Sequence, residues 1–159
     1  MDDTGRSWSL SAILLALSGV TLIGTGLYFL FLRPPLLPED LRYMGLEPAH
    51  VAAVRPRMEP WLAHVFRVMG GYVLATGVLA ITLAATSFRL HERGAGLGAL
   101  IGGAASIGLM AITNFTIGSD FKWTLLGIAA LWAASLVAFA LERSRLSHKL
   151  RQSACAPDV

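Results

Sequence analysis

Charge is scarce in this chain, and the scarcity narrows the class of protein. Only 14% of the 159 residues are Asp, Glu, Lys or Arg, whereas a soluble domain carries about 25%. The charges lie in short segments separated by long uncharged runs, and hydrophobic residues make up 55% of the chain. This distribution excludes an ordinary soluble core. It predicts a single membrane domain over residues 1–159.

Cysteine is nearly absent, since Cys155 is the only one. A lone cysteine excludes an intramolecular disulfide, and it excludes quinone-linked thiol chemistry, which requires a cysteine pair. We expect Cys155 to be an inert thiol in the tail. The sequence also lacks histidines at metal-ligand spacing, a phosphate loop and a nucleophile elbow. We therefore predict no catalytic residue, no metal and no cofactor.

The net charge of +3 does not indicate a nucleic-acid partner. The basic residues lie at the ends of the uncharged runs, where lipid phosphates and the positive-inside bias account for them. The uncharged runs carry no acid at mid-depth, which argues against a proton- or ion-coupled transporter. The partner that the composition predicts is the lipid bilayer.

Four runs are long enough to cross a hydrocarbon core of about 30 Å as helices. They cover residues 10–32, 61–88, 94–115 and 123–141, and residues 142–159 form a polar tail. Arg33-Pro34-Pro35 ends the first helix, and Pro60 suits the first position of the second. Short connections should make spans 2, 3 and 4 antiparallel neighbours. The predicted fold class is all-α, a polytopic four-helix transmembrane bundle.

The long loop between spans 1 and 2, residues 33–60, is predicted to be partly helical. Pro38-Glu39-Asp40 is an acidic helix start that Gly45 can end, and residues 48–54 can form a further turn or two. Apolar residues are mixed with charges throughout the loop. This composition favours a structured cap lying on the bundle at the interface. An ordered connector without a function is the alternative.

The distribution of basic residues gives the orientation. The side with both termini carries Arg6, Arg89, Arg93, Arg143, Arg145, Lys149 and Arg151. The other side carries Arg33, Arg42, Arg55, Arg57, Arg67 and Lys122. The compact basic clusters lie on the first side, so we predict both termini in the cytoplasm of a bacterium and the chain in its inner membrane.

The third span carries a stripe of small residues. Gly94, Gly98, Gly102 and Ser106 recur at four-residue spacing, and Ala95, Ala99 and Gly103 follow one position later. Such a stripe lets another helix approach closely. The partner helix is either in the same chain, where span 2 offers Gly70, Gly71, Ala75 and Gly77, or in another copy.

The candidate binding residues form one polar cluster on the loop side of the membrane: Glu59, His64, Arg67, Asn114, Asp120 and Lys122. Arg67 lies inside the second span, so it should face the interior, pair with a carboxylate or snorkel. Asp120 is the first predicted partner and Glu59 the second. The cluster is either a pocket for a lipid-like or anionic ligand, or an ion pair that locks the loop onto the helices.

The segment Tyr43-Met44-Gly45-Leu46-Glu47-Pro48, with Pro56-Arg57, His64 and Arg67-Val68-Met69-Gly70-Gly71, resembles small uncharacterised bacterial four-span proteins of DoxX-like type. The resemblance covers about 30 residues and the span count. It implies a four-helix membrane bundle and no particular activity. The redox cysteines of better-understood relatives are missing here.

Two functional hypotheses follow from the sequence. The first is a non-catalytic membrane protein that acts through helix packing and its interfacial loop, either as a homo-oligomer or as an accessory subunit of a larger complex. The second is a small membrane enzyme or binder for a lipophilic molecule, with a polar site under residues 33–60 at the ends of spans 2–4. A cavity that opens sideways to lipid beneath the loop would favour the second hypothesis.

Overall fold

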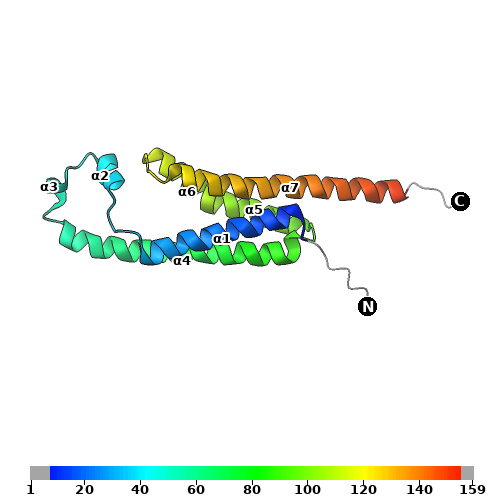
Figure 1. Cartoon of the computed structure of the whole chain (residues 1–159), viewed down its shortest axis with the longest axis horizontal. Coiled ribbons are helices and arrows are strands. Elements are labelled where there is room, and N and C mark those ends of the chain that lie inside the picture. The colour runs from blue at the N-terminus through cyan, green and yellow to red at the C-terminus, as the bar shows by residue number, and fades with distance from the viewer. Residues whose placement is uncertain (1–7, 155–159) are drawn as a thin grey trace.

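The computed structural model describes residues 8–154, which form helices joined by short connections (Figure 1). Four helical stretches are long and apolar enough to cross a membrane: Leu10–Phe31, Arg55–Phe88, Arg93–Thr116 and Lys122–His148. The predicted all-α four-span fold is confirmed, and the chain is an integral membrane protein. Cys155 and Arg6 lie outside the described residues.

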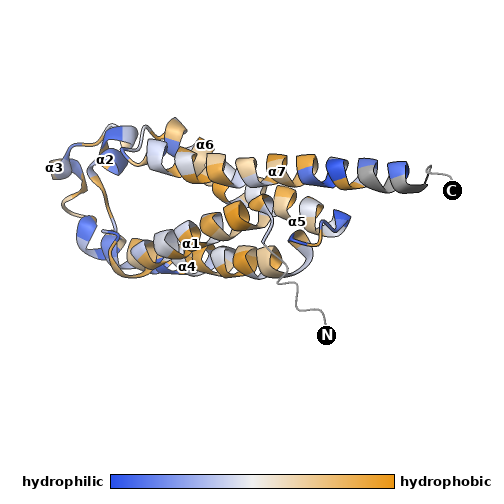
Figure 2. Ribbon diagram, turned by 45° about the vertical axis from the view of Figure 1, so that its right-hand side comes forward, coloured by the Kyte–Doolittle hydropathy of each residue, from blue (hydrophilic) through white to orange (hydrophobic). Residues whose placement is uncertain are grey.

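The first and second spans are helix α1, Leu10–Phe31, and helix α4, Arg55–Leu83, which the π-helical segment η1, Ala84–Phe88, continues. The third span consists of α5, Arg93–Gly103, the π-helical segment η2, Ala104–Gly108, and α6, Leu109–Thr116. The fourth span belongs to α7, Lys122–Ala154. Figure 2 shows apolar residues along these helices and hydrophilic residues at the loop end and on the far part of α7.

Two helices extend beyond the predicted spans. The second helix begins at Arg55, with Pro56 in its first turn, so Pro60 lies inside the helix and not at its first position as predicted. The extra turn is held by an ion pair of 2.7 Å between Arg55 Nε and Glu59 Oε1, one helical turn apart. The fourth helix continues to Ala154, where a polar tail was predicted. Its Leu, Arg, Glu and Lys residues favour helix, and neither glycine nor proline interrupts them.

The long loop contains the short helices α2, Pro38–Met44, and α3, Pro48–Val51. Asp40 accepts a hydrogen bond of 2.8 Å from the Leu37 N–H at the start of α2, and Gly45 ends this helix with a φ of 64°. Both signals were read correctly in the sequence. From the end of α1 the loop crosses the end of the bundle, so that α2 lies beside α6 and α7 (Figure 1).

The helices form two halves that touch along α1. Helix α1 packs most extensively against α4 and next against α7, and α7 also contacts α5 and α6. Helix α4 meets the third span mainly near their connecting turn, through α5 and η1. We predicted that spans 2 and 3 are antiparallel neighbours, but they do not pack along their length. The space between them at the loop end is the cavity described below.

Glycines bring α1 and α4 together. A Cβ atom at Gly19 would lie 2.7 Å from the Gly77 carbonyl oxygen, and one at Gly26 would lie 2.8 Å from that of Gly70. The two glycines on each helix are seven residues apart, so they meet in pairs when the helices run antiparallel. The predicted contact of Gly70 and Gly77 with span 3 is therefore wrong, because both glycines meet α1.

The stripe of small residues on the third span splits between two roles. Ala95, Ala99 and Gly103 are buried, and Trp132 of α7 lies so close to Gly103 that a side chain there would collide with its ring. A Cβ at Gly94, Gly98 or Gly102 would meet no described part of the chain within 4 Å. The residues of this span that pack within the chain are therefore Ala95, Ala99 and Gly103, and not the predicted row of Gly94, Gly98 and Gly102.

Polar contacts close the bundle at the end opposite the loop. Glu142 of α7 accepts a hydrogen bond of 2.5 Å from the Ser11 hydroxyl, and its Oε2 lies 2.9 Å from His91 Nε2. His91 adopts a left-handed φ of 58° in the turn between α4 and α5, and it stacks on Phe139 at 5.4 Å. This cluster ties α1, α7 and the turn together.

Candidate functional site

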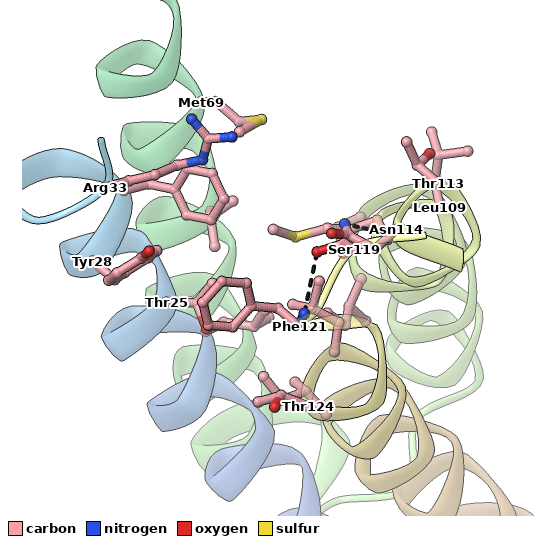
Figure 3. A pocket seen from close by; sticks show the side chains of 18 of the residues that line it. Thr25, Tyr28, Arg33, Met69, Leu109, Thr113, Asn114, Ser119, Phe121 and Thr124 are labelled. Atoms are coloured by element: carbon pink, nitrogen blue, oxygen red, sulfur yellow. Dashed lines mark hydrogen bonds between the residues drawn. The ribbon is translucent and has the colours of Figure 1, made fainter. Parts of the chain in front are cut away.

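A cavity of about 1020 Å³ lies between the two halves of the bundle, beneath α2. Its walls come from α1 and α4 on one side and from η2, α6 and the start of α7 on the other (Figure 3). Tyr72 and Leu109 line it and are also exposed on the outer surface. The cavity therefore opens sideways, toward the hydrocarbon of the bilayer, between α4 and α6.

The cavity runs along α1 from Arg33 to Thr21. Twelve residues of helix correspond to about 18 Å, which is slightly more than half of the roughly 30 Å hydrocarbon core. Because Thr21 lies near the middle of α1, the cavity ends close to the middle of the membrane. Its length suits a lipophilic tail that belongs to one leaflet.

Hydroxyl groups along the walls are largely engaged by their own helices. Thr25 donates to the Thr21 carbonyl at 2.9 Å, Thr76 to that of Tyr72 at 2.9 Å, and Ser106 to that of Gly102 at 2.6 Å. A hydroxyl bonded in this way offers little donor capacity to a ligand. The remaining lining is mainly aliphatic and aromatic, so the body of the cavity is suited to apolar groups.

The π-helical segment η2 shapes one wall. It places Ala105, Ser106 and Ile107 against the cavity. Just before it, the buried Trp132 indole donates a hydrogen bond of 2.9 Å to the Ala99 carbonyl, which fixes the third span on α7. A π-helical turn inside an α-helix often accompanies a functional site, because it displaces the wall from regular packing.

Arg33 marks the polar end of the cavity. Its guanidinium carbon lies 3.4 Å from the centre of the Phe66 ring and 5.5 Å from that of Phe29, and its side chain is only 8% exposed. It also pairs with Asp40 at 3.5 Å and donates to the Pro34 carbonyl at 2.9 Å. Two aromatic faces and a carboxylate hold the cation between α1, α4 and α2.

Burial lowers the pKa of Arg33 from its ordinary value, while Asp40, Tyr28 and Glu39 act in the opposite direction. Arginine remains charged after such a change, because its ordinary pKa is far above neutral. The charged side chains that line the cavity are thus Arg33 and Glu39, and Asp40 pairs with Arg33 from outside the lining.

Glu39 is the carboxylate that faces the cavity. It is 4% exposed, it lines the cavity, and its Oε1 accepts a hydrogen bond of 3.1 Å from the Ser119 hydroxyl. Next to it, Arg42 lies 3.2 Å from Asp120 Oδ1 and donates to the Gly118 carbonyl at 3.1 Å. These contacts attach α2 to the turn between α6 and α7, so α2 covers the end of the cavity.

Phe121 and Asn114 complete the head of the cavity. Phe121 points from the α7 side toward α1, and its ring centre lies 6.2 Å from that of Tyr28 (Figure 3). Asn114 donates its side-chain amide to the Met110 carbonyl at 2.9 Å, which leaves its amide oxygen as an acceptor beside the cavity. Glu39 and Asn114 thus both present acceptor oxygens.

The structure brings together few of the predicted binding residues. Asn114 lines the cavity, whereas His64 and Arg67 are exposed on the outer face of α4. Both predicted partners of Arg67 are engaged elsewhere, Asp120 with Arg42 and Glu59 with Arg55. The predicted pairing of Arg67 is therefore wrong, because α4 is turned so that its glycine face, and not Arg67, meets the bundle.

Lys122 is half-buried at the first turn of α7, and its backbone N–H donates to the Ser119 carbonyl at 3.3 Å. It does not line the cavity. Arg33 and Glu39 were predicted as helix-boundary signals and not as site residues. A usable signal was present, since Arg33 ends an uncharged run that begins at Ser7, and two acids come soon after it. In the described residues, no group of three His, Cys, Asp or Glu side chains could hold a metal ion.

Comparisons of the chain with protein-family models, with curated proteins and with solved structures find no match. The resemblance to DoxX-like proteins therefore stays a prediction. The function has to be argued from the cavity and its surroundings.

Proposed function

We propose that this protein binds a lipophilic molecule in the cavity beneath α2. The observation that carries the proposal is the cavity itself: it is large, mainly apolar, open sideways to lipid and closed at its polar end by α2. Such a site takes its ligand from the bilayer and holds the ligand's head at the interface.

The head of the ligand is an uncharged group that donates hydrogen bonds. Glu39 in the lining repels an anion, and Arg33 is already held by Asp40 and two aromatic rings. Glu39 and Asn114 offer acceptor oxygens. A hydroxyl or amide on the ligand can satisfy them. This favours a lipid alcohol or amide over the anionic ligand considered from the sequence.

A matched pair of variants tests the proposal. Thr25 and Thr82 each donate their hydroxyl to the carbonyl four residues earlier, but only Thr25 lines the cavity. The probe is a monoacylglycerol with a photoreactive group in its acyl chain, and the readout is cross-linking to the protein in nanodiscs. Thr25→Phe should reduce cross-linking at least tenfold because the ring occupies the space of the tail, whereas Thr82→Phe should leave it unchanged.

The head group is tested with the same probe after methylation of both hydroxyls. Removing the donors should weaken binding to the wild type by about tenfold, because Glu39 and Asn114 then receive no hydrogen bond from the ligand. Glu39→Gln should narrow the difference between the two probes. Equal cross-linking of Thr25→Phe and Thr82→Phe, or cross-links outside the cavity-lining segments, would remove the basis for this function.

A second function, assembly with another copy or with a larger membrane complex, is favoured by a separate observation. Gly94, Gly98 and Gly102 lie on a face of α5 where added Cβ atoms would meet no described part of the chain within 4 Å. A flat face of this kind allows another helix to approach. Subunit counting by photobleaching in nanodiscs tests it: Gly98→Leu should convert an oligomer to a monomer, and a wild type that is already monomeric would argue against self-assembly.

We further propose a bacterial inner membrane as the location, with both termini in the cytoplasm. The basic residues around the His91 turn and along the end of α7 support this orientation. A reporter that is active only outside the cytoplasm, fused after residue 159, should stay inactive. Activity of that fusion would reverse the orientation.

A further inference from the structure

A groove on the outer surface lies between α5 and α7, at the end of the bundle opposite the cavity. Its volume is about 440 Å³. The lining consists of apolar side chains with two cations at the end nearest the turn: Leu97, Leu100, Leu136, Ala140, Arg93 and Arg143. Leu97, Leu100 and Ala140 are exposed, so the groove faces the lipid.

The floor of this groove is well packed. The Phe139 ring lies between Phe88, at 4.4 Å, and His91, at 5.4 Å. A Cβ at Gly96 would lie 2.5 Å from Phe139 Cε1, so the glycine is what lets the ring approach α5. The groove therefore has a defined shape before any ligand enters it.

The two arginines form no ion pair with another described residue. Arg143 donates to the His91 carbonyl at 3.4 Å, which holds its guanidinium near the turn, and Arg93 is exposed at the start of α5. Ion pairs among residues 8–154 involve Arg33, Arg42, Arg55 and His91, and neither of these two. Glu142, the neighbour of Arg143, is engaged by Ser11 and His91. The exposed Glu92 is the other acid beside the groove, and neither it nor Glu142 lines the groove, so the charged side chains in the lining are both positive.

The arginines and leucines of the groove are spaced in depth like the phosphate and acyl chain of a phospholipid. Arg93 begins the third span, and Leu97 and Leu100 follow it one and two turns deeper. A phosphate at the level of the arginines would therefore place an acyl chain along the apolar part of the groove. Arginine binds phosphate oxygens through two parallel N–H groups. An anionic head gains more binding energy from these contacts than a neutral or zwitterionic head does.

We propose that the α5–α7 groove binds one anionic phospholipid. Arg93 and Arg143 hold the phosphate, and one acyl chain lies against Leu97, Leu100 and Leu136. The site is separate from the cavity beneath α2 and does not depend on the function proposed for it. The two sites differ in charge, since the groove selects an anionic head and the cavity an uncharged one.

Native mass spectrometry of the full chain released from nanodiscs tests this site. The nanodiscs contain equal amounts of phosphatidylglycerol and phosphatidylcholine with the same acyl chains. The wild type should retain one phosphatidylglycerol in preference to phosphatidylcholine. Each of the changes Arg93→Gln and Arg143→Gln should lower its retention about fivefold, and both together about 25-fold.

Two matched controls separate a site from general attraction. Arg145→Gln removes the same charge from α7, but two residues along a helix place Arg145 about 200° around it from Arg143. It should leave retention unchanged. Ala140→Phe should fill the groove and expel the lipid without changing the charge, whereas Ala133→Phe, on an exposed part of α7 outside the groove, should not.

The preference of the wild type for phosphatidylglycerol needs no variant, so misfolded variants cannot leave the proposal untested. Equal retention of the two lipids by the wild type overturns it. So does a loss in Arg145→Gln as large as that in Arg143→Gln, or full retention of the lipid in Ala140→Phe.

Discussion

Alanine at Gly77 is expected to force α1 and α4 apart. A Cβ at this position would lie 2.6 Å from the Gly19 carbonyl oxygen, 2.8 Å from Ile23 N and 2.9 Å from Ile23 Cγ1. Ordinary contacts of a Cβ begin at 3.4 Å, so the helices would have to separate by about 0.8 Å. Two of the three atoms belong to the backbone and cannot rotate out of the way.

The magnitude follows from two opposing effects. Overpacking of a well-packed contact costs about 1–3 kcal/mol, while replacing glycine by alanine in a helix interior gains about 1 kcal/mol. Gly71→Ala, six residues earlier in the same helix, shares the gain, but its Cβ would meet no described atom outside its own helix within 4 Å. The difference between the two variants isolates the packing effect. Gly77→Ala should be less stable than Gly71→Ala by about 1–3 kcal/mol.

The assay is reversible unfolding in mild detergent micelles by titration with a denaturing detergent, followed by far-ultraviolet circular dichroism. Gly70→Ala should fall between the two, since its nearest contacts, at 2.9 Å, are less severe. If Gly77→Ala were as stable as Gly71→Ala, the close approach of α1 and α4 would be refuted, and with it the position of one wall of the cavity.

Three further changes test other contacts by the same unfolding titration. Trp132→Phe should destabilise the chain by about 1–3 kcal/mol, because the buried Ala99 carbonyl loses its hydrogen bond; stability equal to the wild type would contradict that bond. Glu142→Gln should cost about 1–3 kcal/mol through weaker contacts with Ser11 and the turn, and a neutral result would exclude the polar closure of this end. Arg33→Lys keeps the charge but loses the planar contact with the aromatic rings, so it should cost about 1–2 kcal/mol; full stability would show that charge alone matters there.

The number of spans could be predicted because it depends on local properties. Four long apolar runs can cross a bilayer, and each forms a helix in the structure. The start and end of α2 were predictable for the same reason, since Pro38 and Gly45 act on the backbone next to them. The extra helix at Arg55 and beyond residue 141 was missed because hydropathy marks the membrane-crossing part of a helix, not the helix itself.

The sequence predicts the place of the cavity, beneath residues 33–60, and one lining residue, Asn114, but most other residues of the site depend on how the helices are turned. The sequence allows Arg67 to face the interior, pair with a carboxylate or snorkel; in the structure the glycine face of α4 packs on α1 and leaves Arg67 exposed. Arg33 is buried because Phe66, 33 residues later in the chain, lies against its guanidinium. Glu39 reaches the cavity because α2 crosses to Ser119. A single sequence does not indicate these distant pairings.

An uncharged lipophilic ligand in the cavity can be identified from what the wild type retains. The protein is purified in mild detergent without added lipid, and its bound molecules are identified by native mass spectrometry with fragmentation, in parallel with Thr25→Phe. We expect one uncharged molecule with a hydroxyl or amide head on the wild type and its loss from Thr25→Phe. An anionic molecule that needs Arg33, or a retained molecule that Thr25→Phe does not displace, would contradict this expectation.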